Sequence, residues 1–280
     1  MVPTEAGDRA FREVMTFEPD APASPLEQAT VDFVFGHVWN RPGLSRRERR
    51  WVTLACVAAA DAPDPMIEHI YAALNSGDIQ LPEMLEFVLQ FAVYCGWPKA
   101  SCFEGHLRTQ WARIHQERGE PTPPWPLLAT DTLGPNDFEV RLQGGEQEFR
   151  DVNFVPAPPR DSPYNHAGIL NFVFGHVWQR PNLSRRERRL ITVTCVAIDD
   201  SPLPLQSHVG SALQSRDIST DEMAELALHF AMYYGFAKGQ QLNTVAQQQW
   251  ARIMQEERGP GMPADGTKQL AAQPDRGGEA

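Results

Sequence analysis

The stretch FVFGHVWNRPGLSRRERR, residues 33–50, returns almost unchanged as FVFGHVWQRPNLSRRERR, residues 172–189. The match extends outward from there. Residues 33–114 align with residues 172–253 at a constant offset and without a gap, and about half of the aligned positions are identical. One structural unit therefore occurs twice in the chain. Residues present in both copies are the better candidates for a shared structural or chemical role.

The repeat also sets the predicted domain boundaries. A shorter match between residues 7–14 and 145–152 extends each copy upstream. The last part of the chain is rich in Gly, Pro, Ala, Gln and charged residues and has no apolar face, which predicts disorder. Residues 138–142 are compatible with a short isolated strand. We predict a first repeat over 1–118, a linker packed across the surface over 119–144, a second repeat over 145–258 and a disordered tail over 259–280.

Each copy reads as a series of helices, because apolar residues recur at helical spacing and alternation with a period of two is scarce. Ser45 followed by Glu48 is a capping box that starts one helix, and Ser184 with Glu187 repeats it. The predicted fold class is all-α. The first-copy helices are expected near 27–39, from Ser45 through 51–60, at 64–76 and at 81–94. A last helix is expected after the turn at 95–98 and ends near residue 118. Gly77 is a natural C-terminal cap, whereas the copy has Arg216 and should be capped differently.

Composition excludes several classes of function. The net charge of -11 disfavours nucleic acid or an anionic membrane as the main partner. No apolar run approaches the roughly 20 residues of a spanning helix, and no secretory signal is visible at the N-terminus, so a cytoplasmic protein is expected. The four cysteines, Cys56, Cys95, Cys102 and Cys195, show neither CxxC nor metal-ligand spacing. Cys56 and Cys195 are equivalent positions inside apolar helical runs and are predicted to be small buried residues in a reducing compartment.

Two histidine pairs occupy equivalent positions in the copies and are the candidate catalytic residues. His69 and His208 lie in mid-helix among apolar neighbours, and His37 and His176 follow a glycine and precede Val-Trp. Imidazole can be charged or neutral near pH 7. If both histidines line one pocket, one can act as general acid while the other binds a carboxylate. The alternative is a structural, hydrogen-bonded histidine. The other histidines occur in one copy only and are predicted at the surface: His106, His115, His166 and His229.

Three further pairs are candidate substrate-binding residues. They are Arg50 and Arg189, Tyr94 and Tyr233, and Trp39 and Trp178. The arginines are predicted to point inward toward a substrate carboxylate, while the neighbouring arginines are solvated or in ion pairs. The tyrosines can donate hydrogen bonds and the tryptophans can form an apolar wall, with structural roles as the alternatives. No metal is expected, because a histidine-only site lacks a third ligand in the sequence. No cofactor is expected either.

The motif Phe-Gly-x-Val-Trp-x-Arg-Pro-x-Leu-Ser, the Leu-Ala-Cys-Val-Ala helix, His69 and Tyr94-x-Gly96-x-Pro98 together resemble the carboxymuconolactone decarboxylase family within the AhpD-like fold. The resemblance covers both repeats. It implies an all-helical unit that pairs face to face, with pockets at the pairing surface. Two such units in one chain would form an intramolecular pseudo-dimer. Three chains would then form a hexamer-like ring, so a homo-oligomer is expected.

The resemblance also distinguishes two chemistries. The peroxidase-reductase branch carries Cys-x-x-Cys just before the helix histidine, and the equivalent places here hold Ala62 and Pro65, and Ser201 and Pro204. Disulfide exchange needs two thiolates within bonding reach, which excludes the thiol-based activity. The thiol-free branch resembles decarboxylases of small lactone acids.

The resemblance implies that the helix histidine of the thiol-free branch corresponds to His69 and His208. The chain also departs from the family pattern. An acid is common where His37 and His176 stand, and a small residue is usual at the places of Lys99 and Lys238. These departures leave the substrate open.

We therefore expect a cofactor-free, thiol-independent lyase that acts on a small carboxylated lactone or ring by histidine acid–base catalysis. Decarboxylation needs an electron sink for the bond electrons and a proton for the carbon that loses CO2. Two alternatives stay open: a non-catalytic duplicated scaffold, including one that binds a small acid, and a hydratase, hydrolase or isomerase using the same pocket. A closed interior around His37 and His69 favours the scaffold, whereas an open pocket lined by both favours the enzyme.

Overall fold

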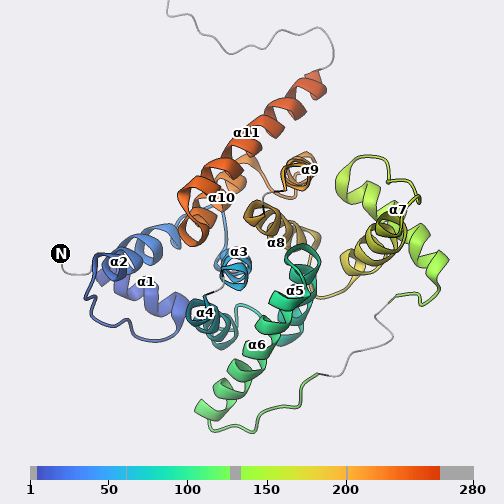
Figure 1. Cartoon of the computed structure of the whole chain (residues 1–280). Helices are drawn as coiled ribbons and strands as arrows, with labels where there is room; N and C mark the ends of the chain where they lie inside the picture. The colour runs from blue at the N-terminus through green and yellow to red at the C-terminus, as the bar shows by residue number, and fades with distance from the viewer. Residues whose placement is uncertain (1–4, 61, 127–133, 200, 259–280) are drawn as a thin grey trace, which may run out of the picture.

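The computed structural model describes residues 5–60, 62–126, 134–199 and 201–258, and within these ranges the chain forms helices and no strand (Figure 1). The all-α prediction is confirmed. The predicted tail, residues 259–280, lies outside the described residues. None of the described helices is both long enough and apolar enough to cross a membrane.

The two repeats have corresponding helices. The first contains α1 (Glu5–Met15), α2 (Pro25–Ala29), η1 (Thr30–Val38), α3 (Arg46–Ala59), α4 (Pro63–Asn75), α5 (Leu81–Cys95) and α6 (Trp97–Glu117). The second contains α7 (Phe138–Asn153), η3 (Tyr164–Phe174), η4 (Val177–Gln179), α8 (Arg185–Ile198), α9 (Pro202–Gln214), α10 (Thr220–Tyr234) and α11 (Phe236–Arg258). Both η1 and η3 are π-helices, and each includes part of the repeated FVFGHVW sequence.

Helix α7 begins earlier than the sequence indicated. Residues 138–142, for which a strand was considered, form its first turn and lie inside the range predicted as a linker. The physical reason is a cap: the Asp137 side chain accepts a hydrogen bond from the Val140 backbone N–H at 2.9 Å. An aspartate at this position satisfies a backbone donor that the helix start leaves without a partner.

The predicted capping boxes are both present, at Ser45 and Ser184. Their glutamates also link the repeats. Glu48 accepts a bond from Arg186 Nε at 2.6 Å, and Glu187 accepts one from Arg47 Nε at 2.7 Å. These reciprocal bonds relate α3 and α8, which lie side by side at the centre (Figure 1), by an approximate twofold axis. The predicted pseudo-dimer is confirmed.

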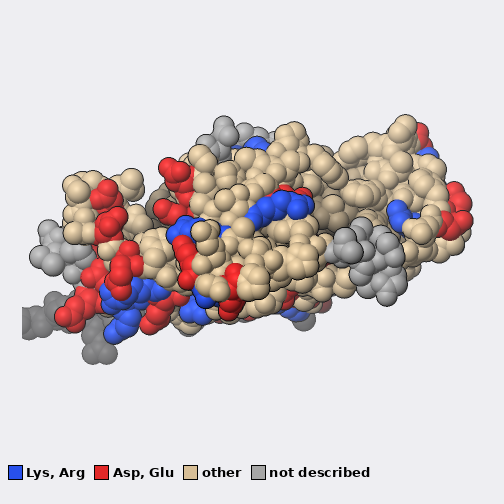
Figure 2. Space-filling view, turned by 90° about the horizontal axis from the view of Figure 1, so that it is seen from below, with Lys and Arg blue, Asp and Glu red and all other residues tan. Residues whose placement is uncertain are grey.

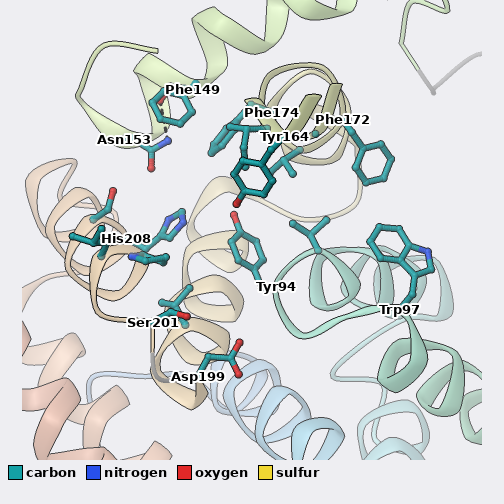
Figure 3. Close-up of a pocket in the computed structure, with 18 residues that line it drawn as sticks. Tyr94, Trp97, Phe149, Asn153, Tyr164, Phe172, Phe174, Asp199, Ser201 and His208 are labelled. Atoms are coloured by element: carbon teal, nitrogen blue, oxygen red, sulfur yellow. Dashed lines mark hydrogen bonds between the residues drawn. The ribbon is translucent and has the colours of Figure 1, made fainter. Parts of the chain in front are cut away.

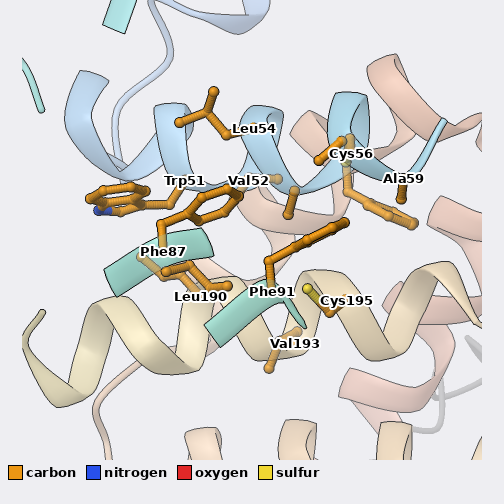
Figure 4. Close-up of a cluster of buried hydrophobic side chains, with 14 of the residues drawn as sticks. Trp51, Val52, Leu54, Cys56, Ala59, Phe87, Phe91, Leu190, Val193 and Cys195 are labelled. Atoms are coloured by element: carbon orange, nitrogen blue, oxygen red, sulfur yellow. The ribbon is translucent and has the colours of Figure 1, made fainter. Parts of the chain in front are cut away.

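The core lies along this central helix pair. Trp51 of α3, Phe87 and Phe91 of α5 and Leu190 of α8 are fully buried and pack together (Figure 4). The core therefore spans the repeat boundary, and neither repeat buries its apolar face alone. Cys56 and Cys195, predicted as small buried residues, belong to the same cluster. On the molecular face in Figure 2, basic side chains lie next to acidic ones rather than forming a continuous basic surface.

A second reciprocal pair of contacts anchors the segment after each repeated tryptophan on the opposite repeat. Arg41 binds Glu225 of α10 at 2.6 Å, and Arg180 binds Glu86 of α5 at 2.7 Å. Glu86 is buried and Arg180 is half-buried, and their side chains are 6% and 9% exposed in this pair. The repeated FVFGHVW sequence is thereby held against the partner repeat.

The sequence predicted that the C-terminal end of α9, at Arg216, would be capped differently from the end of α4, at Gly77. The structure shows the same backbone conformation at both ends. Arg216 adopts the same left-handed conformation as Gly77, with φ of 63° and 77° respectively. The side chain is held by an ion pair with Glu257 at 2.7 Å and by its position over the Trp250 ring at 4.4 Å. These contacts with α11 offset the backbone strain that a non-glycine residue has in this region.

Candidate functional site

Each repeat has a cavity beside its helix histidine. The first has a volume of about 320 Å³ and is lined by His69 and Glu68 of α4 and by Tyr233 of α10. The second has a volume of about 580 Å³ and is lined by His208 of α9 and Tyr94 of α5 (Figure 3). In both cases the tyrosine comes from the opposite repeat. The cavities therefore lie at the surface where the repeats pair.

The histidine rings have the same aromatic surroundings in both sites. His69 stacks on Trp39 at 6.3 Å between ring centroids and meets Tyr233 edge-on at 5.4 Å. His208 stacks on Trp178 at 6.4 Å and meets Tyr94 edge-on, also at 5.4 Å. The two tryptophans lie behind the imidazoles and not among the described residues that line the cavities. They hold the rings in a fixed orientation.

Each tryptophan also binds the tyrosine of the opposite repeat. Trp39 Nε1 donates to the Tyr233 hydroxyl at 2.8 Å, and Trp178 Nε1 donates to the Tyr94 hydroxyl at 2.9 Å. Burial raises the pKa of both tyrosines, so the phenols are protonated at neutral pH. The repeated Trp and Tyr positions thus form one cross-repeat pair per site.

Arg50 and Arg189 are buried, as expected of residues that point inward, but the described lining of neither cavity includes them. Arg50 binds Asp78 at 3.2 Å and the Val14 carbonyl. Arg189 binds Asp217 at 2.6 Å. Their visible role is to join helices, and their charges lie near the histidines. A direct contact with a substrate carboxylate stays a prediction.

Burial governs the charge of the two helix histidines. It lowers the pKa of His69 to about 3 and that of His208 to about 4, and the nearby Arg50 and Arg189 charges act in the same direction. His69 is only 4% exposed, and its Nδ1 atom is buried with no hydrogen-bond partner among the described residues. Both imidazoles are therefore neutral near pH 7 in the free protein.

His37 and His176 do not join the helix histidines in the described linings. His37 is exposed and stacks on Phe33, whereas His176 is half-buried and lies 3.3 Å from Arg180 Nη1. For His37, which lies within η1, the π-helical geometry explains this placement. Trp39 N–H bonds to Val34 C=O, five residues back, so the wider turn changes which side chains share a face. Among the described residues, the lining of each of these two cavities contains a single histidine.

Two functional candidates were missed in the sequence. Glu68 lines the first cavity next to His69, and burial raises its pKa, as does the charge of Asp64. His229 is fully buried, contrary to the surface prediction, and contacts Arg49. Its position within the apolar run of α10 was the available signal. Of the other histidines predicted at the surface, His115 is also buried, whereas two are partly exposed: His106 and His166.

The family of the chain follows from sequence comparison. The profile of the carboxymuconolactone decarboxylase family matches residues 25–103 and 163–248, which together make up more than half of the chain. The chain belongs to the carboxymuconolactone decarboxylase family. Both helix histidines and both cross-repeat Trp–Tyr pairs lie inside the matched segments. Helices α1 and α7 lie outside them and add further cavity walls, with Phe11 in the first site and Phe149 in the second.

Two curated relatives are decarboxylases by name. A nitrosuccinic acid decarboxylase, npaB, of Metarhizium robertsii is 38% identical over 86 residues, which cover 31% of this chain and 58% of that protein. A 4-carboxymuconolactone decarboxylase of Acinetobacter baylyi is 36% identical over 69 residues, which cover 25% of this chain and 51% of that protein. The chain thus spans about half the length of the curated relatives it matches.

The neutral state of His69 predicts a loss of stability in acid. Its folded pKa, about 3, lies below the unfolded value of about 6.5, so the unfolded chain binds more protons below pH 6.5. The contribution of neutral His69 to the free energy of unfolding is complete above pH 6.5. It falls by up to about 1.4 kcal/mol per pH unit as the pH decreases toward 3. Urea unfolding at pH 7.5 and 5.5 should show a smaller decrease for His69→Gln than for wild type. Equal decreases would contradict the neutral assignment.

Proposed function

We propose that the chain is a lyase that removes CO2 from a small carboxylated acid, with His69 and His208 moving the proton. The observation that supports this most directly is a helix histidine beside a cavity in each repeat, neutral and, for His69, with an unpartnered nitrogen. Open cavities of about 320 and 580 Å³ suit small molecules and favour an enzyme over a closed scaffold.

The names of the two relatives point to a common type of substrate. In a nitro acid, the electrons of the breaking bond can move to the nitro oxygens. In an unsaturated lactone, they can move through the double bond to the carbonyl oxygen. Both routes place negative charge on an oxygen atom. We infer that the substrate carries such an electron-accepting group conjugated to the carbon that loses CO2.

The cavity linings favour loss of the carboxylate charge. The described residues that line the two cavities include aromatic and aliphatic side chains but neither lysine nor arginine. A carboxylate that enters is therefore poorly solvated and meets no permanently charged cation in the described linings. CO2 is neutral and has less need of solvation, so this environment favours its departure.

The bound carboxylate also changes the protonation state of the helix histidine. A negative charge beside a buried imidazole favours its protonated form, which raises the pKa from the low value of the free site. Substrate binding then brings a proton onto the ring. After CO2 leaves, the imidazolium delivers that proton to carbon as a general acid.

Proton uptake on binding is the corresponding expectation. Succinate, a dicarboxylate without an electron sink, serves as the probe at pH 7. Calorimetry in buffers of different ionisation enthalpy should report uptake of up to about one proton per occupied site. The His69→Gln, His208→Gln double variant should bind succinate without that uptake. Equal uptake in both proteins would remove the histidines from this role.

The reaction itself is tested with the two acids named in the relatives, nitrosuccinic acid and 4-carboxymuconolactone. Release of CO2 from either acid, measured with a coupled assay, is expected to follow enzyme concentration. If both acids bind and neither releases CO2, a small-acid-binding scaffold becomes the better account. If the acid is rearranged or hydrated instead, the pocket has isomerase or hydratase chemistry.

A further inference from the structure

In the second site, a chain of hydrogen bonds runs from a buried arginine to a threonine near the cavity tyrosine. Arg188 Nη1 donates to Gln90 Oε1 at 2.9 Å, and Gln90 Nε2 donates to Thr192 Oγ1 at 2.9 Å. A guanidinium only donates, so the orientation of the Gln90 amide is fixed. The Thr192 oxygen accepts from that amide, and the threonine side chain lies near Tyr94. The threonine keeps its own proton, which it can donate toward the tyrosine oxygen.

The first site repeats this chain with a histidine in place of the glutamine. His229 occupies the position equivalent to Gln90, with Nδ1 3.4 Å from Arg49 Nη1 and Nε2 2.8 Å from Thr53 Oγ1. Because arginine can only donate, Nδ1 is the acceptor and the proton sits on Nε2. His229 donates to Thr53, whose side chain lies near Tyr233. The hydrogen bonds therefore donate in the same direction in both sites, from the arginine toward the threonine.

Each tyrosine oxygen accepts a hydrogen bond from the indole N–H of the opposite repeat's tryptophan. An indole N–H can only donate. The phenol is therefore the acceptor in this bond, and its own proton is not used by it. Neither the Tyr94 nor the Tyr233 hydroxyl donates to another described residue, and both tyrosines line a cavity beside a histidine. Figure 3 shows Tyr94 and His208 entering the same pocket from α5 and α9.

We propose that Tyr94 and Tyr233 donate a hydrogen bond to the substrate oxygen that becomes negative as CO2 leaves. The proposal rests on the decarboxylase function proposed above. It makes Thr53, Thr192 and His229 positioning residues, together with Gln90, because they direct the phenol proton into the cavity without touching the substrate. Each site then consists of a histidine from one repeat and an oxyanion donor from the other.

The step balances without another reactant. The bond from the substrate carbon to its carboxylate breaks and CO2 leaves. The bond electrons pass through the conjugated system to a carbonyl or nitro oxygen, giving an enolate or a nitronate. The tyrosine keeps its proton and stabilises this charge by hydrogen bonding. The imidazolium then protonates the carbon, and the electrons return from oxygen. The indole donor at the phenol oxygen polarises the O–H group and strengthens it as a donor.

The preformed nitronate of 3-nitropropionate is the probe, because it is an anion with its charge on two oxygens. Wild type is expected to bind this nitronate more tightly than succinate. The Tyr94→Phe, Tyr233→Phe variant should lose about tenfold or more in nitronate affinity and about a hundredfold in kcat, with succinate affinity unchanged. Tyr71→Phe is the matched control, because the Tyr71 hydroxyl binds Glu117 at 2.7 Å outside the described cavity linings. It should leave both affinities unchanged.

The positioning residues have a control within the chain itself. His229→Gln installs the residue used by the second site and should retain nitronate affinity, whereas His229→Leu should lower it at the first site. Thr53→Val with Thr192→Val should lower kcat about tenfold with little change in KM.

The outcomes separate this proposal from the function on which it rests. Unchanged nitronate affinity and kcat in the tyrosine variant, with CO2 still released, would overturn the tyrosine assignment and leave the lyase intact. Binding of both probes without CO2 release from either acid would overturn the lyase. Equal effects of His229→Gln and His229→Leu would overturn the hydrogen-bond chain.

Discussion

A chain that carries both His69→Gln and His208→Gln is expected to release CO2 about a thousandfold more slowly than wild type, with nitrosuccinic acid or 4-carboxymuconolactone as substrate. Glutamine keeps a polar side chain of similar reach but cannot take up and deliver a proton near pH 7. Both histidines must be changed, since each lines a separate cavity. The measurement is kcat/KM from CO2 release, with circular dichroism to verify that the variant is folded.

The single variants assign the activity to the two sites. The first cavity is smaller and has Glu68 beside its histidine, whereas the second is larger and has Ser207 at that place. His69→Gln and His208→Gln should therefore affect small and bulky acids unequally. The matched control is His37→Gln with His176→Gln, because neither residue belongs to the described linings; its kcat/KM should stay within a few-fold of wild type. If the His69, His208 double variant keeps more than a tenth of the wild-type rate, histidine proton transfer is not the mechanism.

Much of the fold was predictable because the repeat supplies two independent readings of each helix. The capping boxes at Ser45 and Ser184 fix helix starts by local chemistry, so they survive in the structure unchanged. The side of η1 that packs inward could not be predicted from the sequence in this way. Helical periodicity assumes 3.6 residues per turn, and a π-helix departs from it. His37, a candidate catalytic residue from the sequence, is exposed in the structure.

The candidate site was only half visible in the sequence for a related reason. His69 and Trp39 belong to the same repeat, but the tyrosine that completes their site comes from α10 of the other one. No local pattern states which copy supplies it. Giving weight only to residues present in both copies also hid His229, because its equivalent is Gln90. The shared feature is the hydrogen-bonding role of that position, with a bond to an arginine on one side and to a threonine on the other.

Gly145→Ala is expected to destabilise the chain by about 3 kcal/mol or more. Gly145 is a buried residue of α7, and a Cβ atom there would lie 1.7 Å from the Leu170 carbonyl oxygen and 2.8 Å from the Gly175 nitrogen. Both are backbone atoms, so no side-chain rotation relieves the contact. The only relief is to move α7 away from η3. Urea unfolding followed by circular dichroism measures the difference.

Gly168→Ala on η3 is the matched control, because a Cβ atom there has no other atom within 4 Å. It should change stability by no more than about 1 kcal/mol, in the stabilising direction. The functional consequence follows from what α7 and η3 carry: Phe149 and Phe174 line the cavity beside His208. A folded Gly145→Ala chain should therefore lose the second site first and keep CO2 release at His69, whose cavity is walled by α1 and η1. Unchanged unfolding of Gly145→Ala would mean that α7 and η3 do not cross at this glycine.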